Sequence, residues 1–227
     1  MSSKSWYLDN PTLFQQIKDD VSRNFPMMIT FTVNDVVLIR GNLQLYDNTH
    51  HEIDQYTIEI ELPKSYPKGI PVVREINNRI PKIPDRHVYD KGGLCLFLLE
   101  EKWKYYKEGT SIVDFINGPI SLYLLGQSFF EQKGVFPQGE RSHGVKGIVE
   151  LYTEILQTDD TEIIKTFVEY LCEPITRGHW PCYCKSGKKI RNCHMNILAE
   201  YRNKIEPEIA MNSLTYLLRE EIDSKKK

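Results

Sequence analysis

Long apolar runs are absent from this 227-residue sequence, and so is any strong excess of charge of either sign. No stretch approaches the roughly 20 apolar residues that an α-helix needs to cross a bilayer. Residues 1–10 lack the basic and apolar blocks of a signal peptide. The formal net charge is -2 and the isoelectric point is near 6.3. These absences predict a cytoplasmic protein without a membrane partner, and they argue against nucleic acid, which a basic surface would attract.

Cysteine is also scarce, with five residues in the whole sequence. Cys182, Cys184 and Cys193 are clustered, whereas Cys95 and Cys172 are isolated. An odd number of cysteines in this arrangement does not suit a disulfide framework in a reducing compartment. The pattern indicates metal ligation and, at an isolated position, possible nucleophile chemistry. Cys172, at the end of an apolar helical pattern, is expected to be a buried structural thiol.

The rest of the composition is that of an ordinary globular protein, with 41% apolar and 26% charged residues. The length suits one domain of about 150 residues together with a smaller one. A glycine-rich stretch at 133–147 marks the expected boundary. We therefore expect one domain at 1–145 and a second, helical one at 146–227.

The first domain has the pattern of an α+β fold. Asn10 and Pro11 are typical of a helix start, and apolar residues follow at helical spacing. Strict alternation over 56–62 predicts a strand with one buried face, and Asn34-Asp35 predicts a hairpin turn. The predicted order is an N-terminal helix, a four-stranded antiparallel meander, a long irregular segment and a helix. The ranges are strands at 27–33, 36–46, 56–62 and 71–76, irregular chain at 77–109, and a helix at 111–132 that Pro119 must kink or restart.

Cys95 lies in the long irregular segment, and segments of that length are usually functional. A cysteine nucleophile needs partial exposure and neighbours that favour its thiolate. Gly92-Gly93 allow close backbone approach just before it, and the flanking leucines can anchor the turn. Taken alone, a lone cysteine among leucines is more often a small core residue.

Several short motifs resemble the ubiquitin-conjugating enzymes. They are a Tyr-Pro turn (Tyr66-Pro67, with Pro71), the stretch Gly92-Gly93-Leu94-Cys95-Leu96, and Trp103 after the cysteine. The resemblance covers about residues 10–131. It implies a UBC-like domain in which Cys95 accepts the C-terminus of a ubiquitin-like or other protein as a thioester.

Two positions depart from that family's pattern. The family's asparagine, which stabilises an oxyanion, is replaced by His87, and an acidic residue that helps an attacking lysine is replaced by Phe97. An imidazole can donate to an oxyanion or act as a base, so His87 is a candidate catalytic residue. The alternative is a loop histidine bonded to backbone. Phe97 puts transfer to lysine in doubt.

The histidine substitution is similar to that in bacterial relatives from antiphage islands, including CBASS systems. This resemblance implies a role in antiviral defence, with a modifier, an activating enzyme supplied in trans, and a target such as a CBASS-type nucleotidyltransferase. Such an enzyme accepts an activated acyl group, which agrees with the absence of a GxxxxGKS/T phosphate-binding loop. The alternative is a non-catalytic, RWD-like binding module with an inert Cys95.

Other polar residues near these motifs have simpler interpretations. His143 is a second histidine that could approach the active-site face, although a surface turn explains it as well. The tyrosines and the aspartate near Cys95 are expected to be packing or partner contacts, not catalysts. They are Tyr89, Asp90, Tyr105 and Tyr106.

The strongest single motif is the run Cys182-x-Cys184 followed by Cys193-His194. Three thiolates and one imidazole are the ligands of a tetrahedral structural zinc site, with no open position for catalysis. The Ser186-Gly187 step allows the chain to reverse. The motif closely resembles the carboxyl-terminal zinc motif of SecA (SEC-C). Reduced surface thiols are the alternative, and His179 is a spare imidazole. Basic neighbours either offset the thiolate charge or bind an acidic partner; they are Lys185, Lys188, Lys189 and Arg191.

Overall fold

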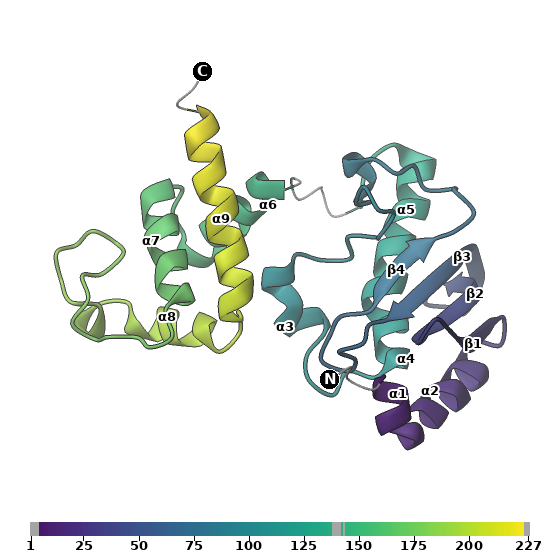
Figure 1. Ribbon diagram of the computed structural model, residues 1–227. Coiled ribbons are helices and arrows are strands. Elements are labelled where there is room, and N and C mark those ends of the chain that lie inside the picture. Colours follow the sequence, from purple (N-terminus) through teal and green to yellow (C-terminus); the bar gives the residue numbers. More distant parts are fainter. Residues whose placement is uncertain (1–4, 138–141, 143, 225–227) are drawn as a thin grey trace. The chain divides into compact units, whose positions relative to one another are not determined.

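The computed structural model describes residues 5–137, 142 and 144–224, with side chains up to residue 219 (Figure 1). The chain forms two compact units. The first comprises Met1–Phe97 and Tyr105–Glu140, and the second comprises Leu98–Lys104 and Arg141–Lys227. A four-stranded antiparallel sheet combined with helices confirms the predicted α+β class. In the described part of the chain, no helix combines the length and apolarity needed to cross a membrane.

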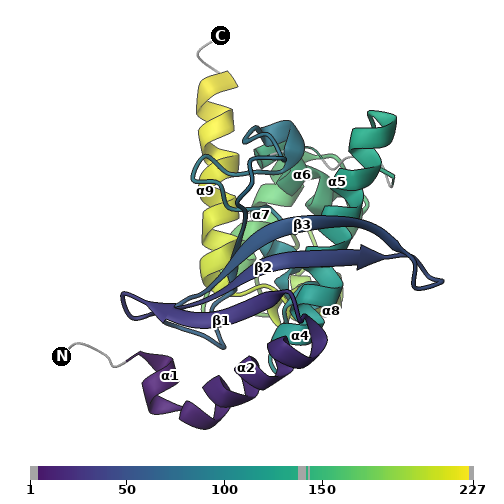
Figure 2. The ribbon, with the colours of Figure 1, turned by 90° about the vertical axis from the view of Figure 1, so that its right-hand side faces the viewer.

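The first unit begins with the helices α1 (Trp6–Asp9) and α2 (Pro11–Asn24). The predicted cap is present, because the Asn10 side chain accepts a hydrogen bond from the Leu13 N–H at 3.1 Å. Ile17 and Val21 are buried, and α2 lies beside the first strand (Figure 2). The amphipathic pattern therefore forms the expected helix and directs its apolar face to the core.

The sheet has the order β1-β2-β3-β4, with bounds Met28–Val33, Val36–Tyr46, Glu52–Leu62 and Val72–Glu75. Asn34 and Asp35 both have positive φ, as a tight hairpin turn requires. β3 starts four residues before the predicted Tyr56, because Glu52–Gln55 pair with the end of β2 although their side chains do not alternate in hydropathy. Ile58 and Ile60 are fully buried, and each such side chain contributes about 1.5–3 kcal/mol by leaving water.

The sequence predicts irregular chain at 77–109, after β4, but the structure contains short helices there. These are η1 (Pro84–Arg86), η2 (Leu99–Glu101) and α3 (Lys102–Tyr105). A longer helical path follows through α4 (Ile112–Phe115), the π-helical turn η3 (Ile116–Ile120) and α5 (Ser121–Lys133). Ser111 caps it by accepting the Asp114 N–H at 3.0 Å. Pro119 lies in the π-helical turn, which accommodates the missing N–H without ending the helix.

The second unit is helical, as expected. Its elements are α6 (Gly144–Leu156), α7 (Thr161–Cys172), η4 (Ile190–Asn192), α8 (Met195–Arg202) and α9 (Pro207–Ser224). Its core includes Phe167 and Tyr152, both fully buried. The segment Leu98–Lys104 belongs to this unit, where buried Glu100 accepts a hydrogen bond from Ser213 on α9.

Candidate functional sites on the two units

Cys95 lies on the second arm of a short antiparallel ladder that follows β4. Val88 and Leu94 form the bridge of this ladder, and the Leu94 N–H donates to the Val73 carbonyl at 2.8 Å. Both bridge side chains are buried, with 6% and 7% exposure, and they fasten the ladder to the core. Because side chains alternate along extended chain, the flanking residues, including Cys95, are directed outward.

Two backbone hydrogen bonds fix the pairing on either side of the bridge. The Cys95 N–H donates to the His87 carbonyl at 2.7 Å, and the Tyr89 N–H donates to the Gly93 carbonyl at 2.8 Å. His87 therefore stands opposite Cys95, and Tyr89 stands opposite Gly93. Since Gly93 has no side chain, the Tyr89 ring reaches diagonally across the ladder, and its hydroxyl donates to the Cys95 Sγ at 3.1 Å.

The Cys95 thiol is half-buried and is not sealed in the core. It lies 3.9 Å from the Phe97 carbonyl oxygen, which accepts a weak hydrogen bond from it. Tyr89, whose hydroxyl donates to the same sulfur, is 55% exposed. Partial exposure next to a hydroxyl donor is an environment in which a cysteine can form its nucleophilic thiolate.

Helix α5 fixes the start of the ladder. The Arg86 carbonyl accepts hydrogen bonds from the Tyr123 hydroxyl at 2.7 Å and from Gln127 Nε2 at 3.0 Å. The Arg86 guanidinium in turn donates from Nε to Gln127 Oε1 at 2.6 Å. The next residue, His87, has a φ of 52°, in the left-handed region that histidine visits more often than most residues. Helix α5 thus holds the residue before the carbonyl that receives the Cys95 N–H, and the Tyr123 hydroxyl also lies 3.5 Å from that His87 carbonyl oxygen.

The structure places His87 and Cys95 side by side, joined by the hydrogen bond from the Cys95 N–H to the His87 carbonyl. The His87 ring packs edge-on against Phe136, with 5.5 Å between ring centroids. Phe97 stacks on Tyr105 at 5.2 Å. His143 lies outside the described residues.

The residue that sequence reasoning missed is Tyr89, which was expected to be a packing or partner contact. The signal for its position is the glycine pair Gly92-Gly93 between Tyr89 and Cys95. A tight turn there pairs the flanking residues and leaves the position opposite the tyrosine without a side chain. Tyr106, in contrast, packs as expected, with its hydroxyl donating to the Pro67 carbonyl at 2.9 Å.

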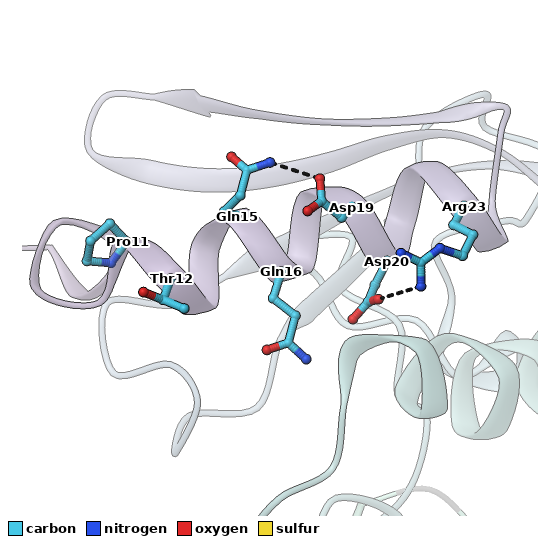
Figure 3. A pocket seen from close by; sticks show the side chains of 7 residues that line it. All are labelled: Pro11, Thr12, Gln15, Gln16, Asp19, Asp20 and Arg23. Atoms are coloured by element: carbon cyan, nitrogen blue, oxygen red, sulfur yellow. Dashed lines mark hydrogen bonds and ion pairs between the residues drawn. The ribbon is translucent and has the colours of Figure 1, made fainter.

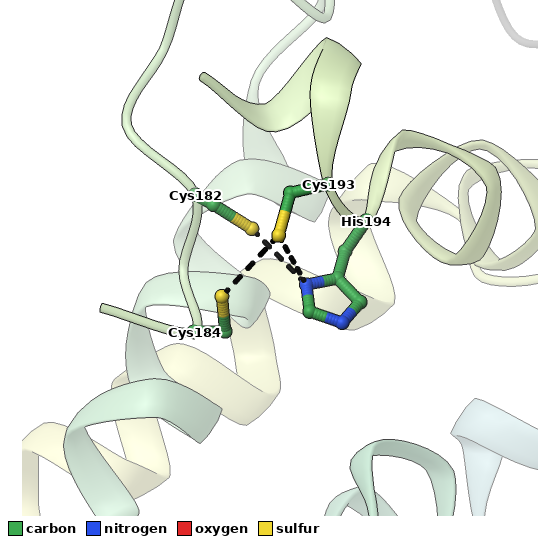
Figure 4. Close-up of side chains that lie close together, drawn as sticks. All are labelled: Cys182, Cys184, Cys193 and His194. Carbon is green, nitrogen blue, oxygen red and sulfur yellow. Dashed lines mark hydrogen bonds between the residues drawn. The ribbon is translucent and has the colours of Figure 1, made fainter. Parts of the chain in front are cut away.

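The second candidate site is a metal centre in the second unit. The side chains of Cys182, Cys184, Cys193 and His194 point toward one another (Figure 4), and their ligand atoms all lie within 4.8 Å. His194 Nδ1 lies 3.2 Å from Cys182 Sγ and 3.3 Å from Cys193 Sγ, and the Cys184 and Cys193 sulfurs are 3.6 Å apart. A tetrahedral ion with bonds of about 2.0–2.3 Å needs ligand separations of roughly 3.3–3.8 Å. The four residues can therefore hold one metal ion.

The local backbone explains this convergence. Pro181 and Lys189 form a bridge, and the Cys182 N–H donates to the Lys188 carbonyl at 2.8 Å. Gly187 has a φ of 75°, which supplies the chain reversal that the Ser186-Gly187 step predicts. This turn carries the first two cysteines, and the other two candidate ligands, Cys193 and His194, lie between η4 and α8.

The ligand thiols differ in their electrostatic environment. Burial raises the pKa of Cys182 to about 11. Burial also acts to raise the pKa of Cys184, but hydrogen bonds with Ser186 and the neighbouring thiols outweigh it and bring the value to about 6. Because a metal binds thiolates, ion binding must release protons from this group of residues.

One basic neighbour has a specific partner. Lys185 Nζ lies 2.7 Å from Asp160 Oδ2, and this hydrogen bond is the main reason why the pKa of Asp160 lies below its ordinary value. Asp160 also caps α7 by accepting the Glu162 and Ile163 N–H groups. The turn that carries Cys182 and Cys184 is thereby linked to the start of α7.

A hollow along α2 carries no comparable chemistry (Figure 3). All its lining residues belong to that one helix, and several pair with each other. Gln15 donates to Asp19 at 2.8 Å, and Arg23 lies 3.7 Å from Asp20. We interpret this hollow as the solvated polar face of an amphipathic helix.

Comparisons with protein-family models, with curated proteins and with solved structures find no match for this chain.

Proposed function

We propose that the chain is a cysteine-dependent acyl-transfer enzyme of the ubiquitin-conjugating type, with Cys95 as the thioester-forming residue. The proposal rests on the environment of the Cys95 thiol. Cys95 is half-buried on the outward face of a ladder, with a hydroxyl donor 3.1 Å from its sulfur. The order of helix, four-stranded meander, cysteine-bearing segment and helix in the first unit supports a UBC-like domain.

The reaction is a transfer of an acyl group between thiols. The Cys95 thiolate attacks the carbonyl carbon of a protein C-terminus held as a thioester on an activating enzyme. A new bond forms between that carbon and Sγ, the old carbon–sulfur bond breaks, and the donor sulfur leaves with its electron pair as a thiolate. A nucleophile on a target protein later takes the acyl group from Cys95. His87 is the proposed donor to the oxyanion of the tetrahedral intermediate.

The proposed metal is zinc, bound by the three thiolates and His194 Nδ1. This donor set fits zinc, and all four tetrahedral positions come from protein, so the ion's role is structural. We propose that the metal centre is a SEC-C-type knuckle that stabilises the fold of the second unit. We further propose that the second unit binds a target protein or the activating enzyme.

The proposed partners are those that the resemblance to the ubiquitin-conjugating enzymes implies. They are a ubiquitin-like modifier or other protein C-terminus, an activating enzyme in trans, and a target protein, which in a cytoplasmic bacterial antiviral system includes a CBASS-type nucleotidyltransferase.

Three variants test the proposal in a mixture with a candidate modifier and activating enzyme. Cys95→Ser is expected to trap a more stable ester, and Cys95→Ala is expected to form no adduct. Cys172→Ala, a matched change at a half-buried thiol in the second unit, leaves the adduct unchanged. An adduct on the Cys95→Ala variant would exclude this mechanism.

One observation favours a second function, a binding module with an inert Cys95. Phe97, two residues after the cysteine, is stacked on Tyr105 and offers no acid or base to an attacking amine. Iodoacetamide labelling discriminates the two functions. Fast labelling of Cys95 with a clear pH dependence supports the enzyme, and resistance to labelling in the native protein supports the binding module.

A further inference from the structure

Tyr89 is the side chain that the ladder places on the sulfur of Cys95. The two residues belong to opposite arms of the turn, and their pairing partners, Gly93 and His87, set their positions. A Cβ at position 93 would lie 3.7 Å from Tyr89 Cδ2, which is an ordinary van der Waals contact, so the tyrosine ring lies directly over this glycine.

The turn also holds the tyrosine backbone from both sides. The Tyr89 N–H donates to the Gly93 carbonyl, and its own carbonyl accepts the Gly92 N–H at 2.7 Å. Gly92 has a φ of 78°, which the turn requires. The hydroxyl is therefore aimed at the sulfur by a paired backbone.

We propose that Tyr89 is a further catalytic residue, whose hydroxyl donates a hydrogen bond to the Cys95 thiolate. The inference rests on the proposed function, since it assigns a role within that acyl transfer. A phenol keeps its proton at neutral pH, because its ordinary pKa is about 10. A thiolate is a stronger acceptor than a thiol, so the hydrogen bond favours the charged, nucleophilic form of the sulfur.

The role of the hydroxyl changes as the reaction proceeds. When Sγ bonds to the acyl carbon, the sulfur loses its negative charge and the carbonyl oxygen gains it. The strongest nearby acceptor is then the oxyanion, to which the same hydroxyl donates by rotation about its C–O bond. Tyr89 retains its proton throughout, and the donor thiolate carries away the electron pair of the broken bond.

The test is the pH profile of Cys95 alkylation in the full-length protein. Iodoacetamide labelling is followed by mass spectrometry of the peptide that contains Cys95, so the other cysteines do not interfere. Tyr89→Phe keeps the ring and removes the hydroxyl. We expect a labelling midpoint about one pH unit higher, which lowers the thiolate fraction at neutral pH about tenfold, and slower labelling there, by less than tenfold because the thiolate of a higher-pKa thiol is more nucleophilic.

Tyr105→Phe is the matched control. It removes a hydroxyl from a tyrosine of the same unit and retains the ring stack on Phe97, so its profile should equal that of the wild type. A Tyr89→Phe profile identical to the wild type would overturn the inference, whatever the adduct assay gives.

The same experiment separates this inference from the proposed function. A shifted Tyr89→Phe profile together with a slower rate of adduct formation supports both. If the Tyr89→Phe profile is shifted but the wild-type protein never forms an adduct on Cys95, Tyr89 does donate a hydrogen bond to the thiolate. That result nevertheless rejects acyl transfer, and with it a catalytic role for Tyr89.

Discussion

At the scale of single residues, Arg86 and Gln127 connect the candidate catalytic ladder to the main helix. Arg86 is 8% exposed and Gln127 is fully buried. Gln127 accepts a hydrogen bond from the Arg86 guanidinium and donates one to the Arg86 carbonyl, so one amide orients the residue that precedes His87. A buried group that loses its partner retains its desolvation cost, which makes such pairs sensitive to substitution.

We expect Gln127→Ala to lower the free energy of unfolding by about 2–3 kcal/mol, because it leaves a buried guanidinium and a carbonyl with fewer partners. Chemical denaturation measures this loss. Gln132→Ala on the exposed face of the same helix is the control, with an expected change within about 0.5 kcal/mol. Equal stability of the two variants would show that the pair does not hold the ladder.

The sequence predicted some of these residues and not others. The convergence of the four candidate metal ligands was predictable, because they lie in one short run whose spacing and turn residues are local signals. The Arg86–Gln127 pair joins positions 41 residues apart, and the Lys185–Asp160 pair joins positions 25 residues apart. Contacts of this kind depend on how helices pack, which a single sequence does not show.

At the scale of elements, an ionic network joins β3 to α5. Arg79 Nη2 lies 2.6 Å from Asp54 Oδ2 and 2.7 Å from Glu131 Oε2, and Ser128 Oγ donates to the same Asp54 oxygen at 2.6 Å. The hydrogen bond from Arg79, aided by that from Ser128, outweighs burial and holds the pKa of Asp54 below its ordinary value of 3.8.

This lowered pKa predicts a pH dependence of stability. Because the folded-state pKa is the lower one, the network contributes fully above the ordinary value of 3.8 and is lost as the pH falls through the folded-state value. Asp54→Asn should lower the melting temperature at neutral pH, and its difference from the wild type should shrink in acid. Asp19→Asn on exposed α2 serves as the control. A difference independent of pH would contradict this account.

The elements themselves were largely predictable. The capped helix, the Asn34-Asp35 hairpin and the alternating half of β3 follow from local spacing and turn chemistry. The short helices η1, η2 and α3 were not predicted, because each is too short to show a hydrophobic period. They are stabilised by surrounding packing, as in the case of Glu100 beside Ser213 on α9.

At the scale of the whole molecule, the chain passes from the first unit into the second just after the candidate nucleophile. Leu98–Lys104 follows Phe97 directly but folds with the second unit. Lys102 pairs with Glu206 at 2.6 Å, and Glu100 is buried beside Ser213. The segment that follows the Cys95 ladder in sequence thus folds with the unit that contains the four candidate metal ligands.

Metal removal is therefore expected to release this segment. The proposed zinc contributes on the order of 10 kcal/mol to local folding, so chelation should reduce helicity and expose Lys102 and Lys104 to trypsin. His194→Ala should lose the metal by elemental analysis, whereas His179→Ala, outside the four-residue centre, should retain it. An unchanged digestion pattern after complete metal loss would show that the segment is held independently of the metal.

In the proposed reaction, the sulfur of Cys95 carries a protein as a thioester with that protein's C-terminus. Intact-mass measurement of the full chain, purified together with the proteins encoded beside it, tests this most directly. We predict an added mass equal to one modifier minus water, which a thiol reductant removes and which maps to the Cys95 peptide. An unmodified mass in the presence of active modifier and activating enzyme, or an adduct located on another residue, would show that Cys95 does not carry the acyl group.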